Sequence, residues 1–129
     1  MKTFFQLREE LAATMEAYAS MYETIHAENF PKGQKPHPSV VKHAKSYEAD
    51  AVFHDYHKDG HSVQSHGGDE YNSYHHIDNK GKHQGHYHYD HETRGGADIP
   101  PKKDIKKALP NSPDHVHTAI HKAIQRDYG

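Results

Sequence analysis

Residues 51–92 read AVFHDYHKDGHSVQSHGGDEYNSYHHIDNKGKHQGHYHYDHE, and this stretch decides the fold. It contains four short runs rich in Tyr, His and Val, and Tyr and Val are residue types that favour strands. The runs are separated by KDG at 58–60, GGD at 67–69 and DNKG at 78–81, which have the composition of tight turns. The pattern predicts an antiparallel β-meander over 51–92, polar on both faces and therefore with a weakly specified register.

Two helices are expected before the meander. Thr3 and Gln6 form a capping box, and the apolar residues that follow recur every three or four positions, so an amphipathic helix is predicted over 3–28. Ser39 is the expected N-cap of a shorter helix over 39–49.

A third helix is expected after the meander. Ser112 is its predicted N-cap and Pro113 its first helical residue, which gives a helix over 112–127. Residues 93–111 carry a Gly-Gly and a Pro-Pro pair and are predicted to be a linker. Together the elements indicate a single small domain of the α+β class.

The composition leaves little material for a core. Leu, Ile, Val and Phe together account for 18 of 129 residues, which is a small share for a folded domain. We therefore expect a thin core that is completed by a protein partner, either further copies of the chain or a larger assembly. The residues predicted to contact this partner form the apolar seams of the first and last helices: Phe4, Leu7, Leu11, Met15, Tyr18, Tyr22, Ile25, Val116, Ile120 and Ile124.

Several function classes have no support in the sequence. The chain has no cysteine, which excludes disulfides and thiolate metal sites, and its apolar runs are too short to span a bilayer. A formal charge of -2 disfavours nucleic acid as a partner. The sequence contains neither a nucleophile elbow nor a phosphate-binding glycine loop, so a soluble protein without enzymatic activity is predicted.

One motif suggests metal chemistry. His86, His88, Asp90 and His91 spell H-x-H-x-D-H, which resembles the metal-binding signature of the metallo-β-lactamase superfamily. That resemblance implies a two-sheet sandwich with flanking helices, generally longer than this chain, and further metal ligands downstream. On a strand, His86, His88 and Asp90 share one face, and these three are the predicted ligands of a possible zinc ion.

The same histidines allow other interpretations. They can be polar strand residues that stack on tyrosines, in which case the protein has no cofactor. The chain holds 16 histidines, whose protonation near pH 6.5 would change its charge greatly, so a metal- or pH-responsive binding module is a further hypothesis.

The N-terminal sequence MKTFFQLREELAA suggests a context. It resembles the N-terminal peptides of head-internal and other structural proteins of large contractile-tailed bacteriophages, in which M-K-T followed by an aromatic residue directs the protein into the forming capsid. Leu7-Arg8-Glu9 matches the Leu/Ile-x-Glu site of the prohead protease in that family. The resemblance implies an accessory virion component made in the host cytoplasm: a capsid cement, decoration, tail or connector piece that is ordered by its neighbours.

Overall fold

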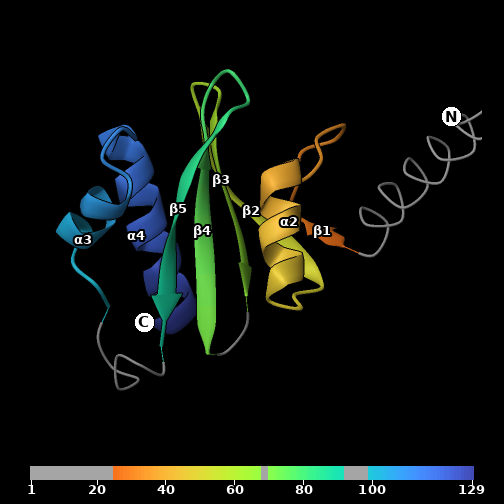
Figure 1. Ribbon diagram of the computed structural model, residues 1–129. Helices are drawn as coiled ribbons and strands as arrows, with labels where there is room; N and C mark the ends of the chain where they lie inside the picture. Colours follow the sequence, from red (N-terminus) through yellow and green to blue (C-terminus); the bar gives the residue numbers. More distant parts are fainter. Residues whose placement is uncertain (1–24, 68–69, 92–98) are drawn as a thin grey trace, which may run out of the picture.

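The computed structural model describes residues 25–67, 70–91 and 99–129, where one five-stranded sheet lies between helices on both faces (Figure 1). The strands lie side by side in chain order, and their bounds are His26–Glu28 (β1), Ala51–Lys58 (β2), His61–Gly67 (β3), Tyr71–Ile77 (β4) and His83–Asp90 (β5). β2 to β5 pair as antiparallel neighbours, which confirms the meander predicted over 51–92. β1 is parallel to β2.

The turn between β2 and β3 shows how the sequence sets the meander. Lys58 pairs with His61, and the two residues between them, Asp59 and Gly60, have φ values of 53° and 83°. Two successive left-handed residues are what a two-residue hairpin turn of type I′ requires, and Asp-Gly adopts this conformation at low cost. A side chain at Gly60 would also lie 2.9 Å from the Asn79 Cβ atom, so glycine is required here for two reasons.

β1 corrects the prediction for the first segment. The predicted helix over 3–28 lies largely outside the described residues, but its last part is a strand in which His26 pairs with Ala51. The cause is tertiary, because pairing with the edge of β2 replaces the local helical pattern. Ile25, predicted to contact a partner, is 6% exposed and packs inside the chain's own core.

α2 spans Pro38–Ser46 and covers one face of the sheet. Its N-cap is His37 rather than the predicted Ser39: the His37 Nδ1 atom accepts a hydrogen bond from the Ser39 backbone N–H at 3.1 Å. Pro38 then occupies the first helical position, where its missing N–H costs nothing. The helix stops at Ser46 instead of residue 49, because Glu48 adopts a left-handed φ of 58°.

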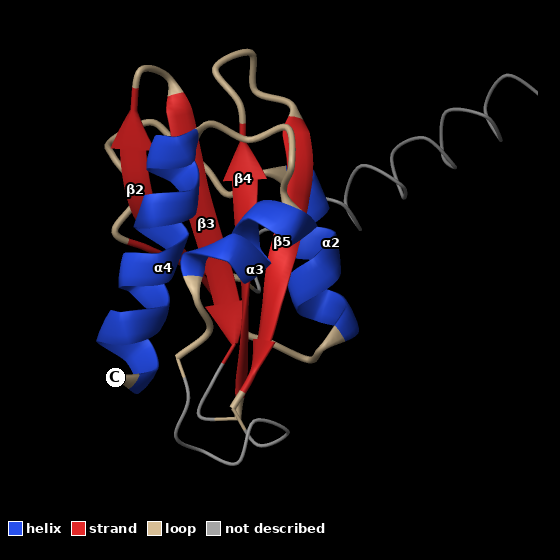
Figure 2. Ribbon diagram, turned by 90° about the vertical axis from the view of Figure 1, so that its left-hand side faces the viewer, coloured by secondary structure: helices blue, strands red, loops and turns tan. Residues whose placement is uncertain are grey.

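α3 (Lys102–Ala108) and α4 (Asp114–Tyr128) cover the other face (Figure 2). The prediction of a linker over 93–111 is therefore wrong for α3, whose Ile105 is fully buried. α4 confirms the predicted last helix, but it begins at Asp114. Pro113 is its N-cap residue, and Ser112 instead bonds the His76 Nδ1 atom at 2.7 Å.

Burial of both sheet faces contradicts the expectation of a polar, weakly specified meander. Ser62 to His66 of β3 and Ser73 to Ile77 of β4 are all buried. Polar strand residues can be buried in this way because their side chains bond one another or the segments that pack on the sheet, as His76 does with Ser112 between α3 and α4. Three residues predicted to face a partner are 0% exposed in the core beneath α4, which corrects that assignment: Val116, Ile120 and Ile124.

The remaining partner prediction is untouched by these findings. The seam residues Phe4, Leu7, Leu11, Met15, Tyr18 and Tyr22 lie outside the described residues, as does the peptide that resembles phage structural proteins. The virion assignment and the absence of enzymatic activity both stay predictions. Within the described ranges, the helices are too short and too polar for any of them to cross a bilayer.

Candidate metal centre

The sheet face beneath α2 carries a layer of imidazoles. Side chains alternate along a strand, so those of β3, β4 and β5 that point toward α2 include His66, His75 and His86. His75 lies directly opposite His86 across the β4–β5 pair, and its ring lies 5.2 Å from that of His66. A fourth ring, from His43, comes down from α2 onto the same place.

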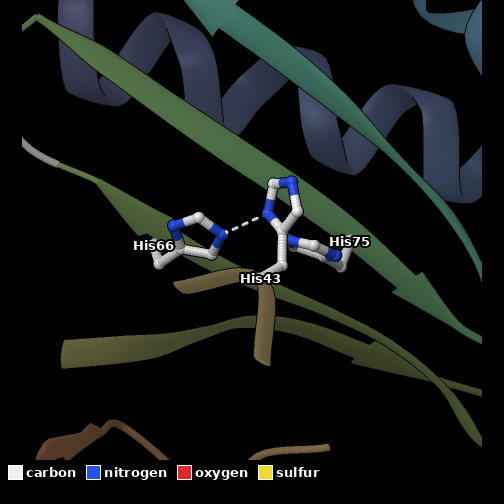
Figure 3. Close-up of side chains that lie close together, drawn as sticks. All are labelled: His43, His66 and His75. Atoms are coloured by element: carbon white, nitrogen blue, oxygen red, sulfur yellow. Dashed lines mark hydrogen bonds between the residues drawn. The ribbon is translucent and has the colours of Figure 1, made fainter. Parts of the chain in front are cut away.

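Three of these side chains, His43, His66 and His75, form a cluster that we call the histidine triad (Figure 3). One ring nitrogen of each lies within 4.8 Å of the corresponding nitrogen of the other two. The His43 Nδ1 and His66 Nε2 atoms are 2.7 Å apart and share a hydrogen bond, and the His43 and His75 ring centroids are 4.9 Å apart. The triad thus joins α2 to the neighbouring strands β3 and β4.

Burial leaves two nitrogens of the triad without partners. His66 and His75 are 0% exposed, and within the described residues the His66 Nδ1 and His75 Nε2 atoms have no hydrogen-bond partner. An unsatisfied buried polar group of this kind costs about 1–3 kcal/mol. Such groups in native proteins call for an explanation, and a bound ion is one of the usual ones.

The electrostatics keep the triad uncharged. Burial, followed by repulsion from His43, His86 and His88, lowers the pKa of His66 to about 3. Burial and then the neighbouring histidines lower the pKa of His75 strongly, and burial with His86 lowers that of His43. At neutral pH these imidazoles therefore carry free lone pairs, the form that binds metals.

Two further histidines, His83 and His86, contact the triad. The His75 Nδ1 atom lies 2.8 Å from the His83 Nε2 atom, and this hydrogen bond holds the ring and leaves Nε2 as its unpartnered nitrogen. The His86 ring stacks on the His75 ring with their centroids 5.0 Å apart, and its centroid lies 4.3 Å from that of the His43 ring. Imidazole ligands of metals are commonly oriented by such a bond from their other nitrogen.

The three residues predicted as metal ligands lie in different surroundings. His86 and His88 do share the face toward α2, as predicted, and His86 adjoins the triad. His88 instead bonds the Ser73 Oγ atom at 2.7 Å and stacks against Tyr47 and Tyr71. In the described part of the chain the triad is the only group of three potential ligands that converges, so His86, His88 and Asp90 do not form a site by themselves.

The triad itself was missed from the sequence. His66 and His75 stand at alternating strand positions, and the predicted hairpins could have placed them on the same face as His86. The contribution of His43 had no such signal, because nothing local to 39–49 shows which sheet face the helix covers. No protein-family model matches the sequence, and comparison with curated proteins and with solved structures finds no match.

Proposed function

We propose that this protein binds a transition-metal ion, Zn²⁺ in the first place, through His43, His66 and His75. The observation that carries the proposal is the convergence of three neutral imidazoles in one place, where the buried Nε2 atom of His75 has no partner among the described residues. Imidazole nitrogen is a preferred ligand of zinc, nickel and copper, and three such ligands leave one position of a zinc tetrahedron for water or a fourth side chain. His86 is the nearest side chain that could supply it.

The geometry requires only local adjustment. Ligand nitrogens around a tetrahedral zinc lie about 3.3 Å apart, because each Zn–N bond is about 2.0–2.1 Å long. The triad nitrogens are spaced between 2.7 Å and 4.8 Å, so small ring rotations bring them to that spacing. The ion would replace the proton between the His43 Nδ1 and His66 Nε2 atoms, and its third ligand would be His75, whose Nε2 atom has no partner among the described residues.

Zinc is expected to bind the chelator-stripped, tag-free protein with one equivalent and to stabilise it. At a free concentration of 100 times the Kd, the gain in unfolding free energy is about 2.7 kcal/mol. Isothermal titration gives the stoichiometry, and a thermal melt with and without chelator gives the stabilisation. His75→Gln should remove both effects, whereas the matched change His88→Gln, on the same sheet face but outside the triad, should preserve them.

X-ray absorption of the zinc-loaded wild type makes the test independent of how well variants fold. We expect three or four nitrogen ligands with the signature of imidazole. Loss of binding in His88→Gln but not in His75→Gln would transfer the site to the H-x-H motif. Equal, weak binding in all variants would show that exposed histidines bind zinc nonspecifically and would overturn the proposal.

A further inference from the structure

A second site lies on the opposite side of the sheet, at the C-terminal end of α4. A cavity of about 680 Å³ is lined there by Phe53, Asp55, His91, Arg126, Asp127 and Tyr128, among other residues. This volume is within the range typical of small-molecule sites. The lining combines carboxylates, a guanidinium and aromatic rings, and none of these residues belongs to the histidine triad.

Asp55 is placed in the cavity wall by an irregularity in β2. The register between β2 and β3 shifts between His54 and Tyr56, so Asp55 is an extra residue in the strand. Bulges of this kind often redirect a side chain at a functional site. The redirected Asp55 side chain is only 4% exposed and reaches the Arg126 guanidinium, with Oδ1 2.8 Å from Nη2.

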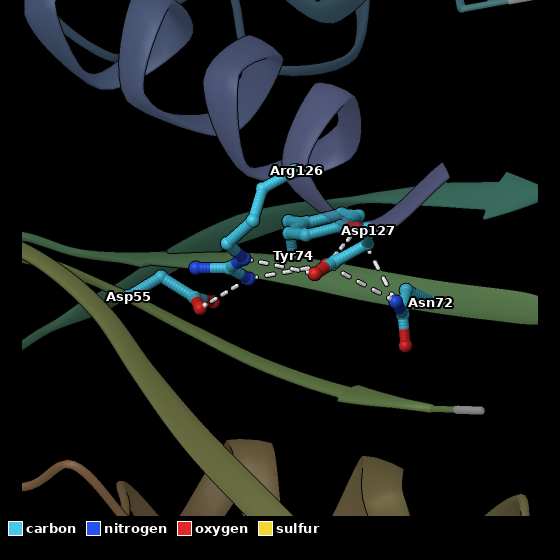
Figure 4. Close-up of polar contacts among 5 residues, drawn as sticks. All are labelled: Asp55, Asn72, Tyr74, Arg126 and Asp127. Carbon is cyan, nitrogen blue, oxygen red and sulfur yellow. Dashed lines mark hydrogen bonds and ion pairs between the residues drawn. The ribbon is translucent and has the colours of Figure 1, made fainter. Parts of the chain in front are cut away.

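The two carboxylates of the site differ in how well they are satisfied (Figure 4). The Asp127 carboxylate accepts hydrogen bonds from Tyr74 at 2.8 Å, from Asn72 at 3.3 Å and from two nitrogens of Arg126 at 2.9 Å and 3.1 Å. Asp55 accepts a hydrogen bond from Arg126 and is also bonded by Ser65, but its buried Oδ2 atom has no partner within the described residues. The Oδ2 atom of Asp55 therefore lacks a hydrogen-bond donor.

The net charge around Asp55 indicates which kind of hydrogen-bond donor this carboxylate would bind. Two carboxylates face one guanidinium, so the cluster of Asp55, Asp127 and Arg126 carries one excess negative charge when both acids are ionised. Burial is the main influence on the Asp55 carboxyl and raises its pKa, despite the opposing effects of Ser65 and Arg126. A cation with N–H donors beside Asp55 would offset this cost through both charge and hydrogen bonding, and so by more than a neutral donor.

Aromatic rings complete the recognition of a cation. Tyr128 stacks against His91 with ring centroids 4.9 Å apart and planes inclined by 23°. Phe53, another residue of the cavity wall, is 37% exposed. The face of an aromatic ring attracts ammonium and guanidinium groups, and the apolar stem of such a ligand packs on the same rings.

We propose that this cavity binds an organic cation with N–H donors, an alkylammonium or alkylguanidinium group, which forms an ion pair with Asp55 next to Arg126. The head group is the one found both in small free amines and in the side chains of Lys and Arg. The site lies on the other face of the sheet from the triad and does not depend on the metal proposal.

The test is a titration of the full-length protein followed by amide NMR shifts, with N-ethylguanidinium, n-butylammonium and tetramethylammonium as probes. The first two should bind and shift residues of the cavity wall, such as Asn72 and Tyr128. Tetramethylammonium has the same charge but no N–H donor, and it should bind at least about tenfold more weakly. A capped Gly-Arg-Gly peptide tests whether the natural ligand is a protein side chain or a small free cation. Tighter binding of the peptide than of N-ethylguanidinium indicates a protein side chain, and equal or weaker binding indicates a free cation.

Variants locate the ion pair. Asp55→Asn should weaken N-ethylguanidinium binding by about tenfold or more, while Asp59→Asn, which removes the same charge from the exposed β2–β3 turn, should leave it unchanged. Tyr128→Leu keeps the carboxylates and should weaken binding severalfold. The proposal is overturned if the wild type binds no probe, if tetramethylammonium binds equally well, or if Asp55→Asn binds like the wild type.

Discussion

Acidification to about pH 4.5 is expected to unfold the metal-free protein. Three histidines that are at most 1% exposed, His66, His75 and His76, have lowered pKa values: about 3 for His66, about 4 for His76, and strongly lowered for His75. Burial is the largest cause in each case. In the unfolded chain these groups titrate near pH 6.5.

The sign follows from which state takes up protons first. Between the unfolded pKa and the folded pKa only the unfolded chain is protonated, so stability is complete above about pH 6.5 and falls as the pH drops. Each such histidine lowers the free energy of unfolding by up to about 1.4 kcal/mol per pH unit, and the three together lower it by up to about 4 kcal/mol per pH unit. Over the two pH units below 6.5 the loss is up to about 8 kcal/mol, which is enough to unfold a domain in the lower part of the usual range of about 5–15 kcal/mol.

Urea melts at pH 7.5, 6.5, 5.5 and 4.5, in the presence of chelator, measure this loss. His66→Gln should reduce the proton uptake on unfolding by about one below pH 6. His26→Gln is the matched control, since the His26 side chain is 73% exposed and should leave the pH dependence unchanged. A urea midpoint that is constant between pH 7.5 and 5.5 would show that the buried histidines are not coupled to folding.

Ile120→Ala is expected to destabilise the isolated chain by about 2–5 kcal/mol. Ile120 is 0% exposed and packs in the core beneath α4 with Val63, Tyr74 and Ile105, so the truncation removes buried contacts and leaves a cavity. In a core with so few aliphatic residues, little neighbouring material can move in to fill it. The exposed change Lys122→Ala on the same helix should alter stability by less than about 0.5 kcal/mol.

This pair of variants also separates two roles for the α4 apolar stripe. If Ile120 served a partner rather than the core, its truncation would leave the urea midpoint of the isolated chain unchanged and would weaken an association instead. Measuring the midpoint at two protein concentrations tests this, because an association-dependent stability rises with concentration.

The meander could be predicted from sequence because its turns are marked locally. Asp59-Gly60 supplies both left-handed residues of a hairpin, and the flanking runs have strand composition. α3 was missed because Pro100-Pro101 suggested a linker, although Ile105 and Leu109 stand four residues apart as on one face of a helix. β1 carried no local signal at all, since its pairing with β2 is a contact between distant segments.

The candidate sites were harder to predict for the same reason. The H-x-H-x-D-H motif drew attention to β5, yet the triad takes its members from α2, β3 and β4, and only the strand register and the docking of α2 bring them together. Asp55 reaches its cavity through a bulge, and the sequence around it does not reveal one. In both cases tertiary geometry decides which polar residues meet.

The parallel pairing of β1 with β2 has a kinetic consequence. Each strand of the meander pairs with its neighbour in sequence. His26 of β1 instead pairs with Ala51 of β2, and the segment between the two residues contains α2. Contacts between close segments form with the smaller entropic cost, so we expect the meander to fold first and β1 with α2 to dock last. His43 would then complete the triad in the final step. A bound ion should slow hydrogen exchange at the buried amides of α2, Val40 and Val41, by delaying the undocking of that helix.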